Sequence, residues 1–509
     1  MALARTSSIA LTGITGCLVD VEADVSQGLP GLTFTGLPDV TVNEARERVR
    51  AAVLNTGLPW PNRRITVALL PADVRKSGSM FDLALALSVL AASGEIGQAS
   101  IDGVVCLGEL GLDGKLRGIR GVLPAVLVAR AAGVSRCIVP HGNAAEASHV
   151  TDMEVLAASS LGEVVHALRG TGGALARLQE VEVLPAEPGA DLADIVGQPV
   201  GRWAVEVAAA GGHNLLLTGS PGAGKTMLAA RLPGVLPPLT DDQALEVTAI
   251  HSIAGLLGTH SGLIRRSPFQ APHHTSSMSA LVGGGSGIAR PGAVTLAHRG
   301  VLFLDEAAEF APKVLDSLRQ PLESGRVVLH RSGGPVDYPA RFQLVMATNP
   351  CPCAAARAVD CSCTPDSRRR YQGRLSRPLL DRIDLQIDVL PVGRADLMDD
   401  LSDREPSSAV ADRVEVARAA ARHRWQDLGW ATNAEVPGPL LRHRSWRPSR
   451  SAMDPVERAL ELGELTARGC DRVLKLAWTL ADLAGQLSPG RAEIESAVQL
   501  RTGRGLVSA

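Results

Sequence analysis

The sequence predicts an α/β protein with a parallel sheet between helices in its central part and a helical C-terminal part. Three observations lead to this class. Apolar runs alternate with alanine-rich segments over residues 18–168, a glycine-rich loop joins an apolar run to a helix-forming segment at residues 213–232, and helical spacing dominates beyond residue 400.

Size and composition fit an ordinary globular protein. The chain has 509 residues, of which 45% are hydrophobic and 20% charged. This length is enough for roughly two to four domains with full cores. The net charge of −2 supplies no overall field that attracts a polyanion, so a nucleic-acid surface must be a local patch.

The beginning of the chain indicates neither a signal peptide nor a membrane anchor. The run at residues 9–19 is interrupted by threonine and glycine and then alternates with acidic residues, as expected of a β-strand. No apolar run reaches the roughly 18 residues that a membrane helix needs. We therefore expect a cytoplasmic protein with no membrane partner.

Residues 1–168 form the first predicted domain, a self-contained α/β unit. Apolar runs at residues 65–70 and 104–107 predict strands, and residues 82–92 and 123–132 predict the helices that pack on them. Residues 169–190 lack periodicity and contain several glycines and prolines, which indicates a linker.

A phosphate-binding loop is the clearest motif of the next segment. It follows an apolar run and opens a helix, which is the context that G-x-x-x-x-G-K-T requires. Its backbone N–H groups can cradle phosphates, Lys225 can reach the β- and γ-phosphates, and the Thr226 hydroxyl can bind Mg²⁺. We therefore expect ATP and Mg²⁺ as cofactors. The loop consists of Gly219, Ser220, Pro221, Gly222, Ala223, Gly224, Lys225 and Thr226.

Two carboxylates end a second apolar run at residues 301–304. Asp305 is expected to hold Mg²⁺ and Glu306 to polarise the attacking water. Neighbouring side chains on a strand point in opposite directions, so the two roles must separate where the strand ends. The sequence therefore predicts a hydrolytic site, not only a binding site.

Two further polar residues are candidates for the same site. Asn349 ends the apolar run 344–348 and suits a sensor of the γ-phosphate or the water. Arg382 lies between Asp381 and Asp384, where it either pairs locally or reaches the γ-phosphate of a neighbouring subunit.

Four of the 8 cysteines fall in the segment 351–363 with the pattern C-x-C-x₇-C-x-C. Four thiolates on one short loop can close a tetrahedral Zn²⁺ site, although each pair is spaced more tightly than the usual C-x₂-C. Redox-active or free thiols are the alternative. The four residues are Cys351, Cys353, Cys361 and Cys363.

The order of these motifs resembles the AAA+ ATPases, and within them the magnesium-chelatase-like branch that includes the competence protein ComM (YifB-type) family. Four segments carry this resemblance: Gln-Ala-Pro-His-His-Thr at 270–275, Gly-Gly-Gly at 283–285, residues 296–306 and residues 318–323. The first predicted domain resembles the Lon-protease-type domain found at the front of the same family. The segments that carry this resemblance are 28–31, 36–39, 46–50 and 108–116.

The resemblance implies three domains: an inactive Lon-like domain at 1–168, an AAA+ core with inserts at 191–400, and a helical lid at 401–509. The position of the Lon nucleophile holds Met80 and that of its lysine holds Leu123, so we expect no peptidase activity. Lys76, Ser77 and Ser79 lie nearby as substitutes. In the lid, Arg468 matches the second sensor arginine, and Arg472 is its competitor.

The resemblance also implies a function. It predicts a ring, expected to be a hexamer, that hydrolyses ATP and moves single-stranded or branched DNA as a helicase or branch-migration motor. Such a motor would serve homologous recombination or natural transformation. Motor subunits of a tetrapyrrole metal chelatase and protein-remodelling ATPases are the alternatives; the chain lacks the chelatase motif Asp-x-Ser-x-Ser.

Two inserts are the expected DNA contacts. Residues 271–291 are rich in His, Ser and Gly and predict an exposed segment, and residues 325–341 predict a hairpin. Arg290, His330 and Arg331 could contact phosphates, or they could be solvated loop charges. The lid helices are expected at 414–425, 455–465, 471–483 and 491–500. Trp425, Trp430 and Trp446 lie among basic residues there, a pattern that fits either DNA binding or packing of the lid.

Overall fold

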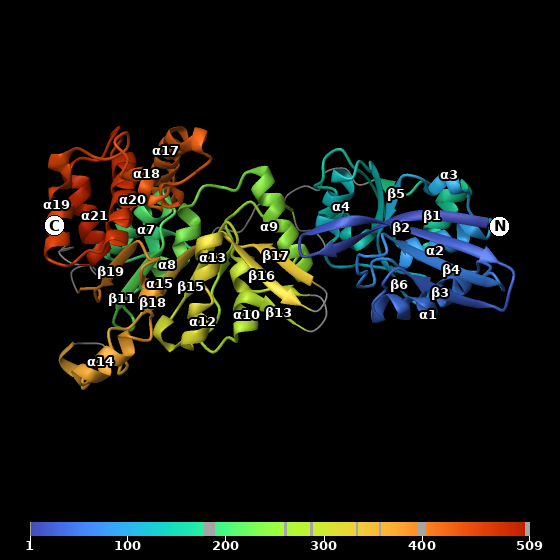
Figure 1. Ribbon diagram of the computed structural model, residues 1–509, viewed down its shortest axis with the longest axis horizontal. Coiled ribbons are helices and arrows are strands. Elements are labelled where there is room, and N and C mark those ends of the chain that lie inside the picture. Colours follow the sequence, from blue (N-terminus) through green and yellow to red (C-terminus); the bar gives the residue numbers. More distant parts are fainter. Residues whose placement is uncertain are drawn as a thin grey trace.

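The computed structural model describes residues 2–177, 189–258, 262–285, 289–331, 334–355, 358–393 and 404–503. A front unit lies at one end of the long axis and the helical lid lies at the other, with the motor core between them (Figure 1). No helix within the described part of the chain is long and apolar enough to cross a membrane. Most of the expected linker, 178–188, lies outside the described residues.

The front unit is built on one mixed sheet in the order β10-β9-β8-β5-β1-β2-β4-β3. The predicted strands and helices of this unit are confirmed, and α2 has the predicted bounds. The strands are β1 (Ala2–Thr12), β2 (Thr15–Ser26), β3 (Gly31–Thr35), β4 (Arg64–Leu70), β5 (Val104–Cys106), β8 (Arg136–Pro140), β9 (Glu154–Ala158) and β10 (Ala176–Arg177). The main helices are α1 (Val40–Asn55), α2 (Asp82–Ala92), α4 (Val122–Ala131) and α6 (Leu161–Arg169).

Two expectations for the front unit are wrong in detail. The run 9–19 is not one strand, because the chain reverses between Thr12 and Thr15, which face each other in the β1–β2 hairpin. Gly13 takes a φ of +67° in this turn, a conformation that a glycine adopts without strain. The unit also extends past residue 168, because β10 pairs with β9 at the edge of the sheet.

The motor core contains a five-stranded sheet in the order β12-β15-β18-β11-β19, with every neighbouring pair parallel. Parallel strands end at the same edge, so the polar residues that follow them meet there. The strands are β11 (Leu215–Gly219), β12 (Phe269–Gln270), β15 (Val301–Leu304), β18 (Gln343–Thr348) and β19 (Leu385–Val389). Helices α7 (Pro199–Gly211) and α8 (Lys225–Val235) flank this sheet.

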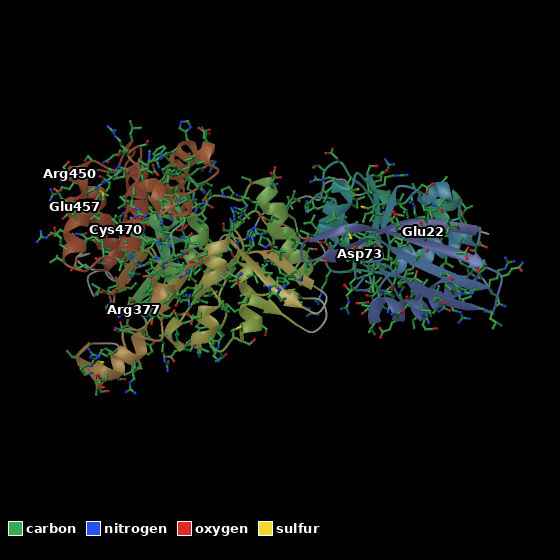
Figure 2. All side chains as sticks on the ribbon, viewed as in Figure 1. Glu22, Asp73, Arg377, Arg450, Glu457 and Cys470 are labelled. Carbon is green, nitrogen blue, oxygen red and sulfur yellow. The ribbon has the colours of Figure 1, made fainter. Side chains whose placement is uncertain are left out.

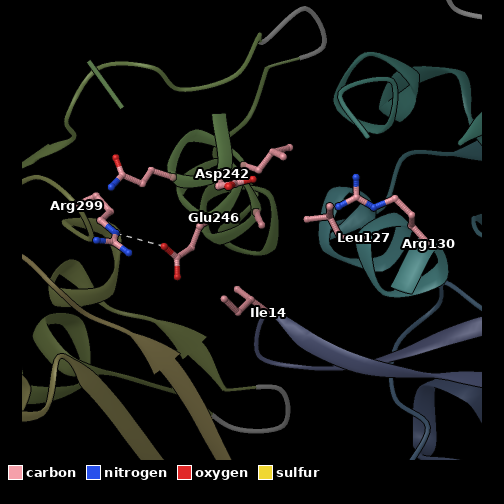
Figure 3. A pocket seen from close by; sticks show the side chains of 9 residues that line it. Ile14, Leu127, Arg130, Asp242, Glu246 and Arg299 are labelled. Atoms are coloured by element: carbon pink, nitrogen blue, oxygen red, sulfur yellow. Dashed lines mark hydrogen bonds and ion pairs between the residues drawn. The ribbon is translucent and has the colours of Figure 1, made fainter. Parts of the chain in front are cut away.

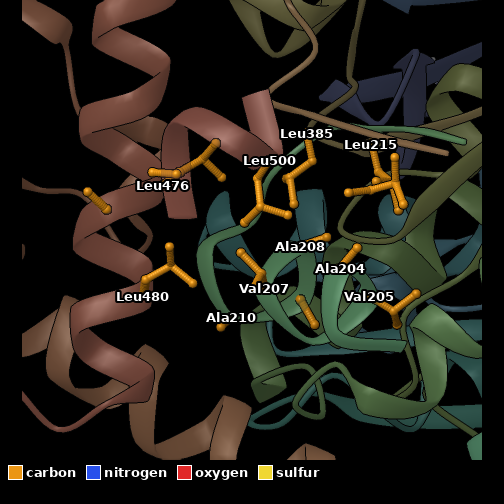
Figure 4. Packing of buried hydrophobic residues seen from close by; sticks show 14 of the residues in the cluster. Ala204, Val205, Val207, Ala208, Ala210, Leu215, Leu385, Leu476, Leu480 and Leu500 are labelled. Carbon is orange, nitrogen blue, oxygen red and sulfur yellow. The ribbon is translucent and has the colours of Figure 1, made fainter. Parts of the chain in front are cut away.

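The lid shares a hydrophobic core with the motor. Leu476, Leu480 and Leu500 of the lid are buried in the same cluster as Val207 and Leu385 of the motor (Figure 4). This continuous packing explains why the lid is a fixed part of the ATPase unit. The lid helices are α17 (Ser407–Trp425), α18 (Gly438–Leu441), α19 (Arg450–Glu461), α20 (Ala467–Leu483) and α21 (Arg491–Thr502).

Helix α19 differs from its predicted range of 455–465. The Ser449 side chain accepts a hydrogen bond from the Ala452 N–H and starts the helix, so Pro455 lies within it. Arg450 and Glu457 of this helix lie at the end of the molecule opposite the front unit (Figure 2). Helix α17 likewise begins before the predicted residue 414, at Ser407.

The lid tryptophans pack against one another. The ring centroids of Trp425 and Trp446 lie 4.6 Å apart, and Trp478 lies 6.0 Å from Trp425. Trp425 is fully buried, and its indole N–H donates to Asn433. These rings therefore form an aromatic core of the lid, as the packing alternative predicts.

The two inserts of the motor lie against each other. Strands β16 (Arg326–Arg331) and β17 (Gly334–Pro339) form the predicted hairpin. Its turn was expected at 332–334; residues 332 and 333 lie outside the described residues, and Gly334 begins β17. The other insert contains α10 (Met278–Val282), β13 (Gly283–Gly284) and β14 (Arg290–Pro291), and most of its described residues before Leu281 are exposed, as expected. The buried Tyr338 hydroxyl donates to the Ala289 carbonyl at 2.6 Å and joins the two inserts.

Candidate nucleotide site and cysteine cluster

The phosphate-binding loop leaves the end of β11 and enters α8. Gly222 and Gly224 have φ angles of +76° and +96°, which side chains rarely adopt. A Cβ atom at either glycine would meet no heavy atom within 4 Å, so backbone conformation alone requires glycine there. The loop therefore turns its backbone toward open space at the N-terminus of α8, where a phosphate group fits.

Lys225 lies between this loop and the end of β18. Its Nζ donates to the carbonyl oxygens of Gly219 at 2.7 Å and Ser220 at 2.9 Å, and to the Asn349 side-chain oxygen at 3.2 Å. Burial lowers the pKa of Lys225, and the carboxylates of Asp305 and Glu306 oppose this shift. The structure thus brings together the lysine and the predicted sensor from separate strands.

Asp305 and Thr226 form the candidate Mg²⁺ position. The Thr226 hydroxyl donates to the Asp305 carboxylate at 2.8 Å, and the other carboxylate oxygen accepts the Glu306 N–H at 2.9 Å. A hydroxyl and a carboxylate oxygen at the edge of a phosphate-binding loop are ligands that Mg²⁺ prefers. The donor set therefore fits the predicted metal.

Glu306 adopts a left-handed backbone conformation with a φ of +49°. The two carboxylates have different partners, because Asp305 accepts a hydrogen bond from Thr226 and Glu306 lies beside His274. The Glu306 carboxylate is 52% exposed and lies 3.3 Å from Nδ1 of His274. His274 belongs to the first insert, and its ring lies 4.1 Å from that of His273.

Two residues at this site were not predicted. His274 lies in the Gln-Ala-Pro-His-His-Thr motif at 270–275, but only the fold shows that this motif reaches Glu306. Gln198 donates to the Ala223 carbonyl at 2.9 Å and to the Leu390 carbonyl at 2.5 Å, which ties the phosphate loop to the end of β19. A lone glutamine before a helix gives no sequence signal for this role.

The two predicted arginines lie outside these contacts. Arg382 pairs with the Glu323 carboxylate of α13 (Arg319–Ser324), and its side chain is only 11% exposed. Arg468 lies 3.9 Å from Asp381 and is 76% exposed, so it is available for another contact. The local pairing that the sequence left open for Arg382 is thus present in the isolated chain.

Arg472, the competitor of Arg468, has a structural partner. It lies 2.9 Å from the fully buried Asp384, which also accepts the Asn214 N–H at 3.0 Å. Burial raises the pKa of Asp384, but the Arg472 guanidinium and the nearby His213 hold it below its usual range. This ion pair connects α20 to the strand β19 and favours Arg468 as the arginine that is free to bind nucleotide.

The four cysteines converge on one point. The Sγ atoms of Cys351, Cys353 and Cys361 lie 3.4 to 3.5 Å apart, and those of all four cysteines, including Cys363, lie within 4.8 Å of one another. A tetrahedral Zn²⁺ with bonds of about 2.3 Å separates its sulfurs by about 3.8 Å. The donor set and its spacing therefore fit zinc.

The surroundings of the cluster stabilise at least one thiolate. Burial raises the pKa of Cys351 to about 12, whereas the Cys363 backbone N–H lowers the pKa of Cys361 to about 6. Arg368 also donates to the Cys361 sulfur at 3.2 Å. The loop departs directly from Asn349 and carries α14 (Pro365–Gln372), which projects from the body of the motor (Figure 1).

The front unit places no nucleophile at the Lon positions. Met80 is 8% exposed and Leu123 is fully buried, and both pack in apolar cores. The nearby Lys76 donates to the Pro71 carbonyl, and Ser79 donates to Glu109. Lys76 and Ser79 therefore have other partners and do not form a serine–lysine pair.

The chain matches three family descriptions in succession. Residues 191–397 match "Magnesium chelatase, subunit ChlI", residues 21–143 match "Subunit ChlI of Mg-chelatase", and residues 404–501 match "Magnesium chelatase, subunit ChlI C-terminal". The front unit is also similar to a Lon protease of Mycolicibacterium smegmatis, at 29% identity over 27% of this chain and 18% of that protein.

Three relatives are similar over nearly the full length. An uncharacterized protein of Mycobacterium tuberculosis is 53% identical over 98% of this chain and 99% of its own length. The competence protein ComM of Haemophilus influenzae is 41% identical, with 96% and 95% covered, and YifB of Escherichia coli is 40% identical, with 98% and 97% covered. With its parallel sheet, helical lid and Lon-like front unit, the chain belongs to the magnesium-chelatase-like ComM/YifB family of AAA+ proteins.

Proposed function

We propose that this protein is an ATP-hydrolysing ring motor that moves DNA, as a helicase or branch-migration enzyme in recombination or natural transformation. The observation that carries the proposal is the direct contact between His274 of the exposed insert and Glu306 of the hydrolytic site. A motor needs its substrate-gripping segment to reach the atoms that control hydrolysis. The name of the relative ComM, a competence protein, supports DNA as the substrate.

Each residue of the site has a role in ATP hydrolysis. The loop N–H groups and Lys225 bind the phosphates, and Thr226 and Asp305 would hold Mg²⁺, which neutralises charge on the phosphates. Glu306 orients and polarises the attacking water, and Asn349 fixes the position of Lys225 and of the γ-phosphate. The separation of the two carboxylates allows metal binding and water activation to proceed side by side.

Arg382 would complete this site from the next subunit. In the isolated chain Arg382 pairs with Glu323. When the ring assembles, Arg382 would leave Glu323 and bind a phosphate of the neighbouring subunit's nucleotide. Arg468 is an exposed arginine of the lid and would contact the nucleotide bound at the phosphate loop. We propose a closed ring, of six subunits, because one shared site per interface requires each subunit to face the next.

The two inserts are the proposed DNA contacts. Arg290 and His330 are both exposed, and the side chain of Arg331 lies outside the described residues. The Tyr338–Ala289 hydrogen bond links the strands that carry them, so the inserts would move together. A ring repeats this modest charge around its axis, which gives a local basic surface despite the neutral chain.

A structural Zn²⁺ in the cysteine cluster is also part of the proposal. Cys351, Cys353, Cys361 and Cys363 would bind it, and the metal would supply the folding energy of a loop that has little apolar surface to bury. The cluster begins two residues after Asn349. An ordered cluster would therefore hold the end of β18 and its sensor in place.

The test is ATP hydrolysis by the full chain with and without branched or single-stranded DNA. Glu306→Gln is expected to retain ATP binding and to lower kcat by about 100-fold or more, because a positioned base contributes that much. The matched control is Glu309→Gln, whose carboxylate lies in the same segment but pairs with Arg374 on the surface. Strand displacement or branch migration should be lost only in Glu306→Gln.

A metal-chelatase motor is the second candidate, because the matching family is described as a magnesium chelatase subunit. The two functions share the ATP site and differ in the substrate that stimulates ATP hydrolysis. Hydrolysis that DNA leaves unchanged, together with metal insertion into a tetrapyrrole on reconstitution, would replace the DNA proposal with this one.

A further inference from the structure

The front unit packs against a helix of the motor, α9 (Asp241–Ala254). Ala249 is 2% exposed and belongs to the apolar core of the front unit, where Leu245 packs beside it. On the front side this core contains α4, whose Leu123 and Val126 are fully buried. The two units thus share a core at this helix and are not joined only by the linker.

Polar contacts fix the end of the same helix. The Ser252 hydroxyl donates to the Glu146 carboxylate at 2.6 Å, and the Ser252 carbonyl accepts the Gly121 N–H at 3.3 Å. Asn143 donates to the other Glu146 oxygen at 2.6 Å. Glu146 and Ser252 are both buried, so these bonds exclude other registers of α9 on the front unit.

An adjacent face of α9 holds the segment that leads into β15, the strand that ends at the hydrolytic carboxylates. The Glu246 carboxylate lies 2.9 Å from Nε2 of His298. It also accepts a hydrogen bond from Arg299 at 3.3 Å (Figure 3). These two residues precede β15, which ends at Leu304, directly before Asp305. Glu246 therefore fixes the start of the strand whose end forms the hydrolytic site.

The segment held by Glu246 is also bound to the hairpin insert. His298 Nδ1 accepts the Arg341 N–H at 2.9 Å, and the Arg299 N–H donates to the Arg341 carbonyl at 2.6 Å. Arg341 follows strand β17 of the hairpin. Arg299 has a φ of +59°, so the chain takes a backbone conformation that these contacts must hold.

The front unit touches the hairpin directly as well. The turn between β1 and β2 lies against β17, where a Cβ atom on Gly13 would come within 3.0 Å of the Asp337 carbonyl oxygen. Ile14 of this turn lines a cavity of about 390 Å³ together with Leu127 of α4 and Glu246 of α9 (Figure 3). The front unit, α9 and Arg299 of the segment before β15 thus meet around one space.

We propose that Glu246 is a positioning residue of the hydrolytic site and that α9 carries the placement of the front unit to Asp305 and Glu306. This inference rests on the ATP hydrolysis proposed above. Glu246 acts by fixing His298 and Arg299, and through them β15. The front unit is then a fixed support for α9 and the hairpin, which explains why a unit without a nucleophile is retained on the motor.

The first experiment compares Glu246→Gln with Asp242→Asn in the full chain. Asp242 lies one turn earlier on α9 and lines the same cavity, but it has no ion pair to the β15 segment among the described residues. Glu246→Gln should lower kcat about tenfold and leave KM for ATP, nucleotide binding and Tm nearly unchanged, because a small misplacement of catalytic groups is costly. Asp242→Asn should leave kcat, KM for ATP, nucleotide binding and Tm unchanged.

The second experiment tests whether the front unit acts through Glu246. Ser252→Ala, which removes the bond to Glu146, should lower kcat several-fold in the wild-type background and have no further effect in Glu246→Gln. The inference would be overturned if the losses of kcat in Ser252→Ala and Glu246→Gln multiply in the double variant, or if Glu246→Gln has the wild-type kcat. Either result would leave the proposal of ATP hydrolysis intact. A wild-type chain that hydrolyses no ATP would overturn the proposed function as well, and the two failures are distinguishable in the same assay.

Discussion

At the scale of single residues, the hydrolytic site depends on pairs that join distant segments. Lys225 meets Asn349, Thr226 meets Asp305, and His274 meets Glu306, each across two different elements. Glu306 stands on a left-handed turn after β15, and its side chain is half exposed. Its orientation is therefore set by His274 more than by packing.

This arrangement predicts a role for His274 that its neighbour does not share. His274→Ala should lower kcat about tenfold and change nucleotide affinity little, because the position of Glu306 is then undefined. His274→Asn, which keeps a side-chain donor, should restore part of the activity. Steady-state ATPase kinetics with quantified nucleotide binding provide the measurement.

His273→Ala is the matched control, because His273 bonds to Thr275 and does not contact Glu306. Equal losses in His273→Ala and His274→Ala would mean that the insert as a whole, and not the His274–Glu306 contact, supports hydrolysis.

At the scale of elements, the cysteine loop is the part that cannot be stable by burial alone. Cys353 is exposed, and Cys361 and Cys363 are partly exposed, whereas only Cys351 is buried. Loops with so little apolar contact need another source of order, and a bound metal is the one that this donor set offers. The loop lies between β18 and α14, so its order affects the sensor Asn349.

Zinc content tests this element. Protein purified without chelators should contain about one Zn²⁺ per chain, and Cys361→Ser should lose most of it, since one of four ligands is missing. Loss of the metal should also lower the Tm of the protein and its rate of ATP hydrolysis. Metal analysis by mass spectrometry and thermal melts provide the readout.

Cys17→Ser serves as the control, because Cys17 lies on β2 of the front unit, outside the cluster. Wild-type protein without zinc, and with all four thiols reactive, would assign the cluster to thiol chemistry instead.

At the scale of the whole molecule, the isolated chain holds only part of the expected hydrolytic site. Arg382 is engaged by Glu323, away from the phosphate loop. Ring assembly is the event that would bring a second chain's arginine to the nucleotide. The proposed shared site therefore makes a prediction about mixtures of chains that a self-contained site does not make.

Arg382→Ala and Glu306→Gln chains should each be inactive alone and regain activity when mixed. About one quarter of the interfaces in a random mixed ring then pair an intact glutamate with an intact arginine. Arg377→Ala is the control, since Arg377 is exposed, begins the short helix before Arg382 and is labelled in Figure 2. Mixtures that stay inactive, or an active Arg382→Ala chain, would contradict a shared site.

Much of the fold was predictable because its signals are local. The order of strand, glycine loop and helix predicted β11 and α8, and apolar runs before Asp305 and Asn349 predicted β15 and β18. The hairpin turn at Gly13 was missed because Ile14 places an apolar residue within the turn, so the run 9–19 was interpreted as one strand. The first turns of α17 and α19 were missed because propensity marks helix ends weakly.

The sequence by itself determined the residues that can bind phosphate, Mg²⁺ and zinc, because each motif is a short segment of fixed spacing. Only the tertiary structure decided which distant partners position them. His274 and Glu246 each contact residues far along the chain, and Arg382 pairs with Glu323 of α13. Such contacts depend on how strands, helices and inserts pack against one another, and no local pattern records that packing.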